Sequence, residues 1–176
     1  MNETWTAPDG TVVTIRPIRA ADLELERQFV NGLSRVSGYR RLMSARTPSL
    51  DELRRFTDID PTRELALIAT IAVNGREHQI GVARYVKSES VRGEAEFAIV
   101  LSDDWQRRGL GTVLLGKLVQ AAKRDGVRRL AGSALTENTA MHALGRKIGF
   151  SIARNSASAT LSDLTLDVLT GSSPFA

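Results

Sequence analysis

The chain has 176 residues, of which 42% are hydrophobic and 25% charged, enough to bury the core of one globular domain. Cysteine is absent, which excludes disulfides, thiolate metal ligands and a cysteine nucleophile, and no other pattern indicates a metal site. The net charge of +4 lacks a dense basic tract, so we expect no nucleic-acid partner. No apolar run could span a membrane and no signal peptide begins the chain, so we expect a cytoplasmic protein without a membrane partner.

The first half of the chain predicts a strand, two helices and then antiparallel strands. Asp22, and either Ser49 or Asp51, are residue types that begin helices, because their side-chain oxygens accept hydrogen bonds from free backbone N–H groups. Asn74-Gly75 favours a two-residue hairpin turn, so the strands on either side of it are expected to pair. In chain order we expect strand 12–18, helix 22–33, helix 49–56 and strands 65–73, 80–86 and 94–101.

In the second half the hydrophobic period becomes helical at Gly111, and Gly126 ends this helix. A strand, a helix and two weaker strands are then expected over 129–135, 139–148, 150–153 and 161–168. This order predicts an α+β sandwich, in which helices flank a mixed, mostly antiparallel central sheet. We expect one domain over residues 1–176, with flexible tails at about 1–8 and 171–176.

Residues 99–112 carry the strongest chemical signal. A strand leads through a polar turn into Gly109-Leu110-Gly111 at the start of a helix. Glycines at such a turn let consecutive backbone N–H groups point into one concavity, and the helix N-terminus adds partial positive charge. Arg107 and Arg108 add full charges beside it, so the segment predicts a phosphate-binding site.

The sequence around the glycines also resembles two other phosphate-binding motifs, but each of them is incomplete. The dinucleotide fingerprint needs a third glycine where Leu114 stands, and no parallel βαβ unit follows. A nucleotide-triphosphate loop needs Ser or Thr where Leu118 follows Gly116-Lys117, and these residues lie inside the predicted helix. We therefore expect neither a dinucleotide enzyme nor an ATPase.

The pattern Gln106-x-x-Gly109-x-Gly111 resembles the (Gln/Arg)-x-x-Gly-x-(Gly/Ala) signature of the GNAT acetyltransferase superfamily. The strand before it and the amphipathic helix after it are in the places that this family has them. Residues 138–150 resemble a second family element, the Asn-…-Leu-x-x-x-x-Gly-Phe helix. The resemblance covers nearly the whole chain and implies the GNAT acyl-CoA N-acyltransferase fold, with acetyl-CoA as the cosubstrate.

The resemblance also implies how acetyl-CoA is bound. Backbone groups on the strand are expected to bind pantetheine as an added strand, the turn to bind the pyrophosphate, and Asn138 to bind the far end of the pantetheine arm. The N–H of Val100 is expected to polarise the thioester carbonyl. The residues assigned to acetyl-CoA in this way are Ile99, Val100, Leu101, Gln106, Arg107, Arg108, Gly109, Leu110, Gly111, Thr112 and Asn138.

Shorter segments narrow the resemblance to the catalytic domain of bacterial Pat-type protein lysine acetyltransferases. They lie over residues 56–60, 63–68, 81–85 and 95–98. The resemblance therefore implies a protein lysine as the favoured acceptor, such as that of an acyl-CoA synthetase. Pat-type proteins often carry an extra regulatory domain, which we do not expect in a chain of this length.

Glu96 is the candidate catalytic base. Without cysteine, an amine is expected to attack the thioester directly, and an amine that is protonated near neutral pH must first lose a proton. Glu96 lies among apolar neighbours that are expected to shield it from water, and a glutamate in the matching Ala-Glu-Phe-Ala stretch is the base that the Pat-like resemblance implies. The alternative is a structural glutamate paired with Arg84, and Glu94 on the same face is the second candidate.

One departure from the family concerns the leaving group. Many GNAT enzymes have a tyrosine where Gly145 stands, to protonate the departing thiolate; here solvent would protonate it, or it would leave as the thiolate. His142 on the same helix is expected to be a surface or core histidine. Two other functions stay open: acetylation of a small-molecule amine, and a non-catalytic acyl-CoA-binding sensor.

Overall fold

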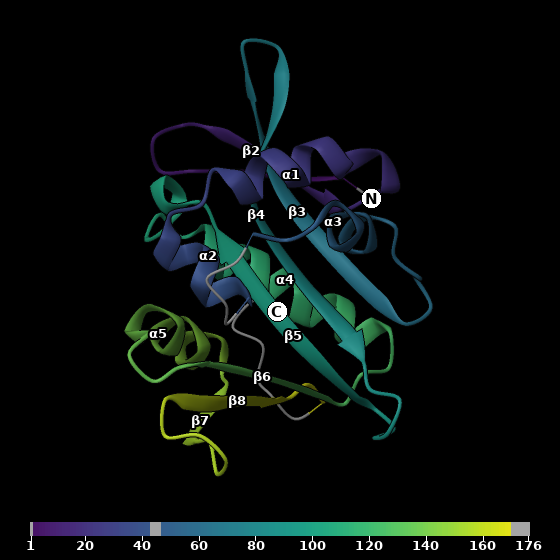
Figure 1. The fold of residues 1–176 in the computed structure, drawn as a ribbon, viewed down its shortest axis with the longest axis vertical. Helices are drawn as coiled ribbons and strands as arrows, with labels where there is room; N and C mark the ends of the chain where they lie inside the picture. Colours follow the sequence, from purple (N-terminus) through teal and green to yellow (C-terminus); the bar gives the residue numbers. More distant parts are fainter. Residues whose placement is uncertain (1, 43–46, 170–176) are drawn as a thin grey trace.

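The computed structural model describes residues 2–42 and 47–169, which form one eight-stranded sheet with helices on both faces (Figure 1). The strand order is β1-β2-β3-β4-β5-β6-β8-β7, and every neighbouring pair is antiparallel except β5–β6, which is parallel. The predicted α+β sandwich with a mixed, mostly antiparallel sheet is confirmed. The strands are β1 (Glu3–Thr6), β2 (Val12–Pro17), β3 (Glu64–Val73), β4 (Arg76–Lys87), β5 (Glu94–Leu101), β6 (Arg129–Leu135), β7 (Ser151–Arg154) and β8 (Leu161–Asp167).

The helices divide into two groups, one on each face of the sheet. The short 3-10 turns η1 and η2 precede α1 and α4. On one face, α4 buries its leucines against the sheet beside α5; on the other, α1 and α3 pack Phe29 and Leu53 onto Ile68 and its neighbours. The helices are η1 (Ala20–Asp22), α1 (Leu23–Asn31), α2 (Arg35–Leu42), α3 (Leu50–Thr57), η2 (Asp103–Trp105), α4 (Leu110–Arg124) and α5 (Thr139–Ile148).

Local sequence signals account for several element boundaries. Ser49 begins α3 with a capping box, in which its hydroxyl accepts from the Glu52 N–H while the Glu52 carboxylate accepts from the Ser49 N–H. Asn74 and Gly75 both have positive φ, 52° and 75°, as a two-residue hairpin between β3 and β4 requires. These local features agree with the sequence predictions.

The structure corrects the sequence prediction at two places. We expected residues 1–8 to be a flexible tail, but residues 3–6 form β1 and pair with β2. Trp5, in this strand, packs against the core. Helix α2 was not predicted, because its sequence has no continuous apolar face. The tail expected over 171–176 lies outside the described residues. No helix in the described part of the chain is long and apolar enough to cross a membrane.

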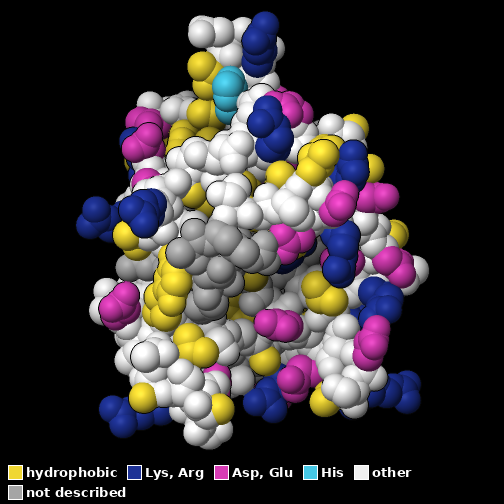
Figure 2. Space-filling view, in the orientation of Figure 1, with side chains coloured by type: hydrophobic (Ala, Val, Ile, Leu, Met, Phe, Trp, Pro, Cys, Tyr) yellow, Lys and Arg dark blue, Asp and Glu magenta, His cyan; other side chains and the backbone are white. Residues whose placement is uncertain are grey.

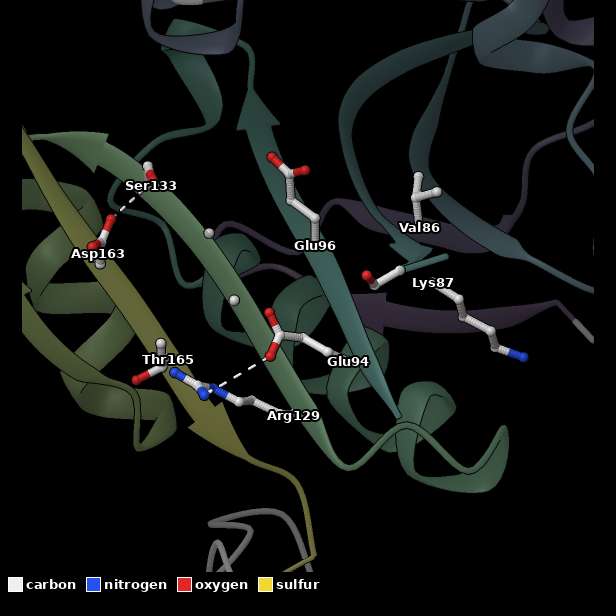
Figure 3. Close-up of a pocket in the computed structure, with 11 residues that line it drawn as sticks. Val86, Lys87, Glu94, Glu96, Arg129, Ser133, Asp163 and Thr165 are labelled. Atoms are coloured by element: carbon white, nitrogen blue, oxygen red, sulfur yellow. Dashed lines mark hydrogen bonds and ion pairs between the residues drawn. The ribbon is translucent and has the colours of Figure 1, made fainter. Parts of the chain in front are cut away.

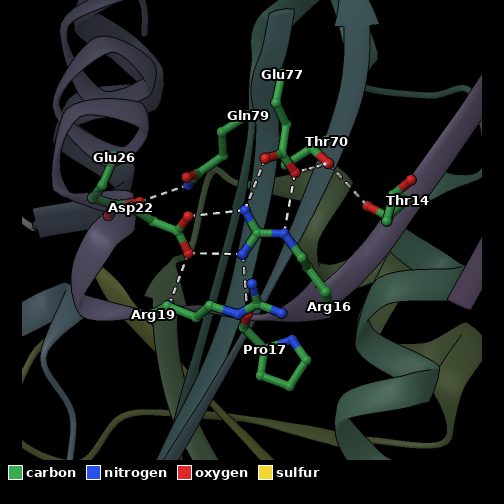
Figure 4. A network of polar contacts seen from close by, with 9 residues as sticks. All are labelled: Thr14, Arg16, Pro17, Arg19, Asp22, Glu26, Thr70, Glu77 and Gln79. Carbon is green, nitrogen blue, oxygen red and sulfur yellow. Dashed lines mark hydrogen bonds and ion pairs between the residues drawn. The ribbon is translucent and has the colours of Figure 1, made fainter. Parts of the chain in front are cut away.

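A buried ion network fastens η1 and the β3–β4 hairpin to β2 (Figure 4). The guanidinium of Arg16, 5% exposed, donates to both carboxylate oxygens of Asp22 at 2.7 and 2.8 Å and to Glu77 at 3.0 and 3.1 Å. Burial alone would raise the pKa of Asp22, but hydrogen bonds from Arg16 and from the Arg19 N–H lower it below its ordinary value. The Asp22 side chain therefore holds Arg16, and it forms no capping hydrogen bond to α1.

Candidate active site

The central sheet opens between β5 and β6. The two strands pair at only three positions, Glu94↔Arg129, Ala95↔Leu130 and Glu96↔Ala131. Beyond Glu96 the pairing stops, although β5 continues to Leu101 and β6 to Leu135. This opening, which we call the split, leaves one edge of β5 without a neighbouring strand over its second half.

The register of β4 and β5 decides which backbone groups of β5 face the split. The Ser88 N–H donates to the Glu94 carbonyl and the Ser102 N–H to the Ile80 carbonyl, so the even-numbered residues of β5 exchange hydrogen bonds with β4. The N–H and C=O of Ile99 and Leu101 therefore point into the split. The N–H of Val100, which we expected to polarise a thioester carbonyl, points to β4 instead, and this expectation needs revision.

The glycine turn, residues 106–111, lies at the end of the split where α4 begins. Arg107 and Gly109 have positive φ, 59° and 93°, and Gly109 is the N-cap of α4. Among the described residues, the N–H groups of 107 to 111 have no hydrogen-bond acceptor. Five consecutive unused donors at a helix N-terminus form a concavity suited to phosphate. The Thr112 N–H, assigned to the same role, instead donates to the Gly109 carbonyl at 3.1 Å.

The two arginines of the turn differ in their surroundings. Arg107 is exposed, whereas Arg108 lies over the Trp105 ring at 5.2 Å and donates to Asp9 at 3.0 Å. Arg108 and Asp9 both remain about half exposed, so this ion pair contributes little free energy and can be exchanged for another anion. Trp105 is buried and belongs to the hydrophobic core.

Gln106, the first residue of the signature, connects the glycine turn to α2. Its side-chain amide donates to Ser37 Oγ at 3.1 Å and to the Leu101 carbonyl at 3.3 Å. Ser37 and Ser34 in turn donate to the Asp103 carboxylate. Burial tends to raise the pKa of Asp103, but the hydrogen bonds from the two serines outweigh it, and the pKa is lowered.

Asn138 and its neighbours on α5 have mainly structural contacts. The Asn138 Oδ1 accepts from the Met141 N–H and caps the helix, which leaves its amide N–H groups for another partner. His142 is buried, so of the two possibilities that the sequence left open, a surface or a core histidine, it is a core histidine. A Cβ at Gly145 would lie 2.8 Å from Leu164, so a tyrosine could be placed there only if Leu164 moved.

A pocket of about 440 Å³ lies on the sheet face at the apex of the split, and we call it the sheet-face pocket (Figure 3). Figure 2 shows this face of the molecule, with acidic side chains in its lower middle part. The pocket combines three carboxylates with two basic side chains. It is lined by Val86, Lys87, Ser88, Glu94, Glu96, Arg129, Ala131, Gly132, Ser133, Asp163 and Thr165.

Glu96 occupies the position where the split opens, as the last residue of β5 that pairs with β6. Its side chain is exposed, because strand alternation turns Ala95 and Phe97 into the core and Glu96 outward. The expectation that apolar neighbours shield Glu96 from water is therefore wrong. Within the described residues its carboxylate has no hydrogen bond or ion pair, while Arg84 donates to the Phe56 carbonyl at 2.6 Å.

The second candidate, Glu94, is less available. It lines the same pocket, but its carboxylate lies 3.8 Å from the guanidinium of Arg129. Asp163 on β8 was not singled out from the sequence, although it also lines the pocket. Its alternation with buried Ser162 and Leu164 could have placed it on the exposed face of a strand. The pairing of β8 with β6 could not be read from that pattern.

The split, the glycine turn and the sheet order together define the GNAT acyltransferase class of fold. The chain belongs to the GNAT acetyltransferase family, because the family model described as "Acetyltransferase (GNAT) domain" matches residues 13–151. It is therefore a GNAT-family acetyltransferase.

Individual relatives agree with this assignment. An acetyltransferase of Pseudomonas aeruginosa is 34% identical over 145 residues, which cover 81% of this chain and 76% of the relative. The acetyltransferase Pat of Mycolicibacterium smegmatis is 30% identical over 135 residues, 77% of this chain but only 40% of that protein. The crystal structure of the GNAT domain of S. lividans PAT superposes with a TM-score of 0.84 at 26% identity, over 94% of this chain and 96% of that one.

Proposed function

We propose that this protein transfers the acetyl group of acetyl-CoA directly to an amine, with a protein lysine as the favoured acceptor and Glu96 as the base. The observation that carries the proposal is the position of Glu96. It lies at the apex of the split, with the glycine turn at one end and the sheet-face pocket beside it. One carboxylate therefore borders both a site suited to a phosphate-bearing cosubstrate and a pocket open to a second substrate.

The residues along the split fit acetyl-CoA. The C=O of Ile99 and the N–H of Leu101 lie on an open strand edge and can pair with the amides of pantetheine. The five free N–H groups of the glycine turn suit the pyrophosphate, and exposed Arg107 can add its charge. The free amide N–H groups of Asn138 remain the candidate for the far end of the pantetheine arm.

Glu96 is suited to removing a proton from the incoming amine. A rise of about 3.3 Å per residue puts Ile99, which faces the split, about 10 Å along the strand from Glu96. This separation suits proton transfer through bridging water molecules rather than by direct contact. Exposure of the carboxylate, which the sequence did not predict, is compatible with such a water-mediated route.

The remaining steps involve the backbone of β5. We propose that the N–H of Ile99, rather than that of Val100, polarises the thioester carbonyl, because the Ile99 N–H points into the split. No side chain at position 145 can protonate the departing thiolate, so we propose that it leaves as the thiolate or takes a proton from water. Glu96 then holds the proton taken from the amine and returns it to solvent.

A protein lysine is favoured by the sequence resemblance to Pat-type protein lysine acetyltransferases and by the similarity to the S. lividans PAT domain. The sheet-face pocket is open at the molecular surface and can admit a long side chain. A small amine would enter the same pocket, and only the measured acceptor preference separates the two.

The test is release of CoA thiol from acetyl-CoA in the presence of a panel of small amines and lysine-containing proteins. We expect turnover by the wild type and a loss of about a hundredfold or more in Glu96→Gln, with acetyl-CoA affinity unchanged. The matched control is Glu24→Gln, which removes an exposed carboxylate on α1 and should leave turnover intact.

Each other result has a distinct meaning. Turnover that is insensitive to Glu96→Gln would support the transferase activity but contradict the role of Glu96 as the base. Turnover of small amines alone would reject the protein acceptor. Binding of acetyl-CoA without turnover of any acceptor would indicate a sensor and contradict the proposal.

A further inference from the structure

The charges in the sheet-face pocket are unequally compensated. Glu94 lies opposite Arg129, and the Lys87 ammonium extends away from the carboxylates and donates to the Thr62 carbonyl (Figure 3). Two carboxylates remain without a cationic partner among the described residues, Glu96 on β5 and Asp163 on β8. The proposed function uses Glu96 as a base and gives no role to Asp163.

Asp163 is held in place without being neutralised. Its Oδ1 accepts from the Asn155 amide at 2.8 Å and from Ser133 Oγ at 3.2 Å, and both donors are uncharged. Such contacts fix the direction of the half-buried carboxylate while its negative charge stays available. A carboxylate with this support is suited to binding a cation that arrives with the substrate.

The register gives the separation of the two carboxylates. Glu96 pairs with Ala131, and Asp163 pairs with Ser133, two residues further along β6. From the usual strand spacing and rise, the Cα atoms of Glu96 and Asp163 lie about 12 Å apart. Both side chains face the same pocket from strands on either side of β6, so they can contact two separate positive groups of one molecule.

We infer that Asp163 determines the specificity of the acceptor pocket by binding a second positive charge next to the amine that reacts at Glu96. The acceptor class is thus a primary amine with a neighbouring cationic group. A lysine beside a basic residue and a small diamine share this chemistry. The inference rests on the proposed function, because it takes the sheet-face pocket as the acceptor site.

The test compares acceptors that differ only in the second charge, using wild type, Asp163→Asn and the control Glu24→Gln. In Asp163→Asn the new side-chain amide would keep an acceptor oxygen for Ser133 and Asn155 while the charge is removed, so the variant should fold normally. The peptide probes contain one lysine flanked by arginine or by alanine, and the small probes are diamines and monoamines of equal length. Calorimetric binding of each probe is measured separately from turnover.

We expect the wild type and Glu24→Gln to favour the doubly charged probes by about fivefold or more in kcat/KM, and Asp163→Asn to lose this preference. In Asp163→Asn, turnover of singly charged probes should fall by less than turnover of doubly charged probes, and the wild-type preference should fall as salt is raised. Preference for the peptides alone or the diamines alone would show which source supplies the second charge. No preference in the wild type, or an unchanged one in Asp163→Asn, would overturn the inference.

Failure of the proposed function has a different signature. If no acceptor is turned over but the doubly charged probes bind in an Asp163-dependent manner, the transferase mechanism fails and the second-charge site stands. If binding shows no dependence on Asp163, the inference fails whatever the turnover.

Discussion

The two ends of the split are built by different means. The glycine turn uses backbone N–H groups from five consecutive residues, 107 to 111, and its shape depends on positive φ at Arg107 and Gly109. The sheet-face pocket uses side chains that four strands bring together from residues 86 to 165. The first site is a local conformation, whereas the second exists only when the whole sheet has assembled.

In the proposed function, the glycine turn binds the cosubstrate and the sheet-face pocket binds the acceptor. A backbone site keeps its donors whatever side chains surround it, which suits a cosubstrate that does not change. A side-chain pocket changes with single substitutions, which suits an acceptor that differs between proteins of one fold. Substitutions at the two ends should therefore change cosubstrate and acceptor parameters independently.

The largest expected effect concerns the stability of the fold on which both ends of the split are built. Arg16→Met leaves the buried Asp22 carboxylate without its cation and should lower the free energy of unfolding by about 3–5 kcal/mol. Chemical denaturation measures this free energy of unfolding. The control Arg27→Met breaks an exposed ion pair and should change it by less than about 0.5 kcal/mol. Equal effects of the two variants would show that the buried network contributes no more than a surface pair.

A second prediction concerns the apex of the split. A Cβ at Gly132 would lie 2.9 Å from the Phe97 carbonyl oxygen, so Gly132→Ala should displace β5 beside Glu96 and cost about 1–3 kcal/mol. Turnover should fall more than acetyl-CoA affinity. Gly145→Ala is the control, since the one atom that its Cβ would approach closer than 3.4 Å is the end of a side chain, Cδ2 of Leu164, and not a backbone atom. A larger loss of stability in Gly145→Ala would contradict this account.

The third prediction addresses the glycine turn. Gly109 has φ of 93°, so Gly109→Ala should strain the turn by about 1–2 kcal/mol and weaken acetyl-CoA binding about tenfold, with acceptor KM unchanged. Gly126→Ala, at the other end of α4 with φ of 75°, should cost similar stability without affecting acetyl-CoA binding. Titration calorimetry distinguishes them, and equal affinities would argue against a phosphate site at the turn.

The smallest expected effect depends on pH. Because the pKa of Asp103 is lowered in the folded protein, its carboxylate adds stability that is present above its unfolded pKa, about 3.9, and is lost as the pH falls through the folded pKa. Asp103→Asn should therefore be less stable than the wild type at pH 7, with a difference that shrinks toward pH 3. Urea denaturation at the two pH values measures this difference in the free energy of unfolding. A difference that grows as the pH is lowered would contradict the prediction.

The sequence by itself determined the features that depend on neighbours in the chain. Gly75 and Gly149 adopt positive φ where a hairpin and a helix end need it, and α5 begins at its Asn138 cap. The glycine turn belongs to the same class, since the sequence alone indicates both its glycines and its proposed role in binding phosphate. Such features are set by steric limits on φ and by hydrogen bonds between nearby residues.

Only the tertiary structure decided the features that depend on strand pairing. Register turned the Val100 N–H toward β4 and the Ile99 N–H toward the split, and alternation exposed Glu96 despite its apolar neighbours. The pairing of β8 with β6 brought Asp163 into the pocket of Glu96 from 67 positions away in the sequence. A shift of one residue in any of these ladders would exchange the two faces of a strand, and local sequence does not fix the ladder.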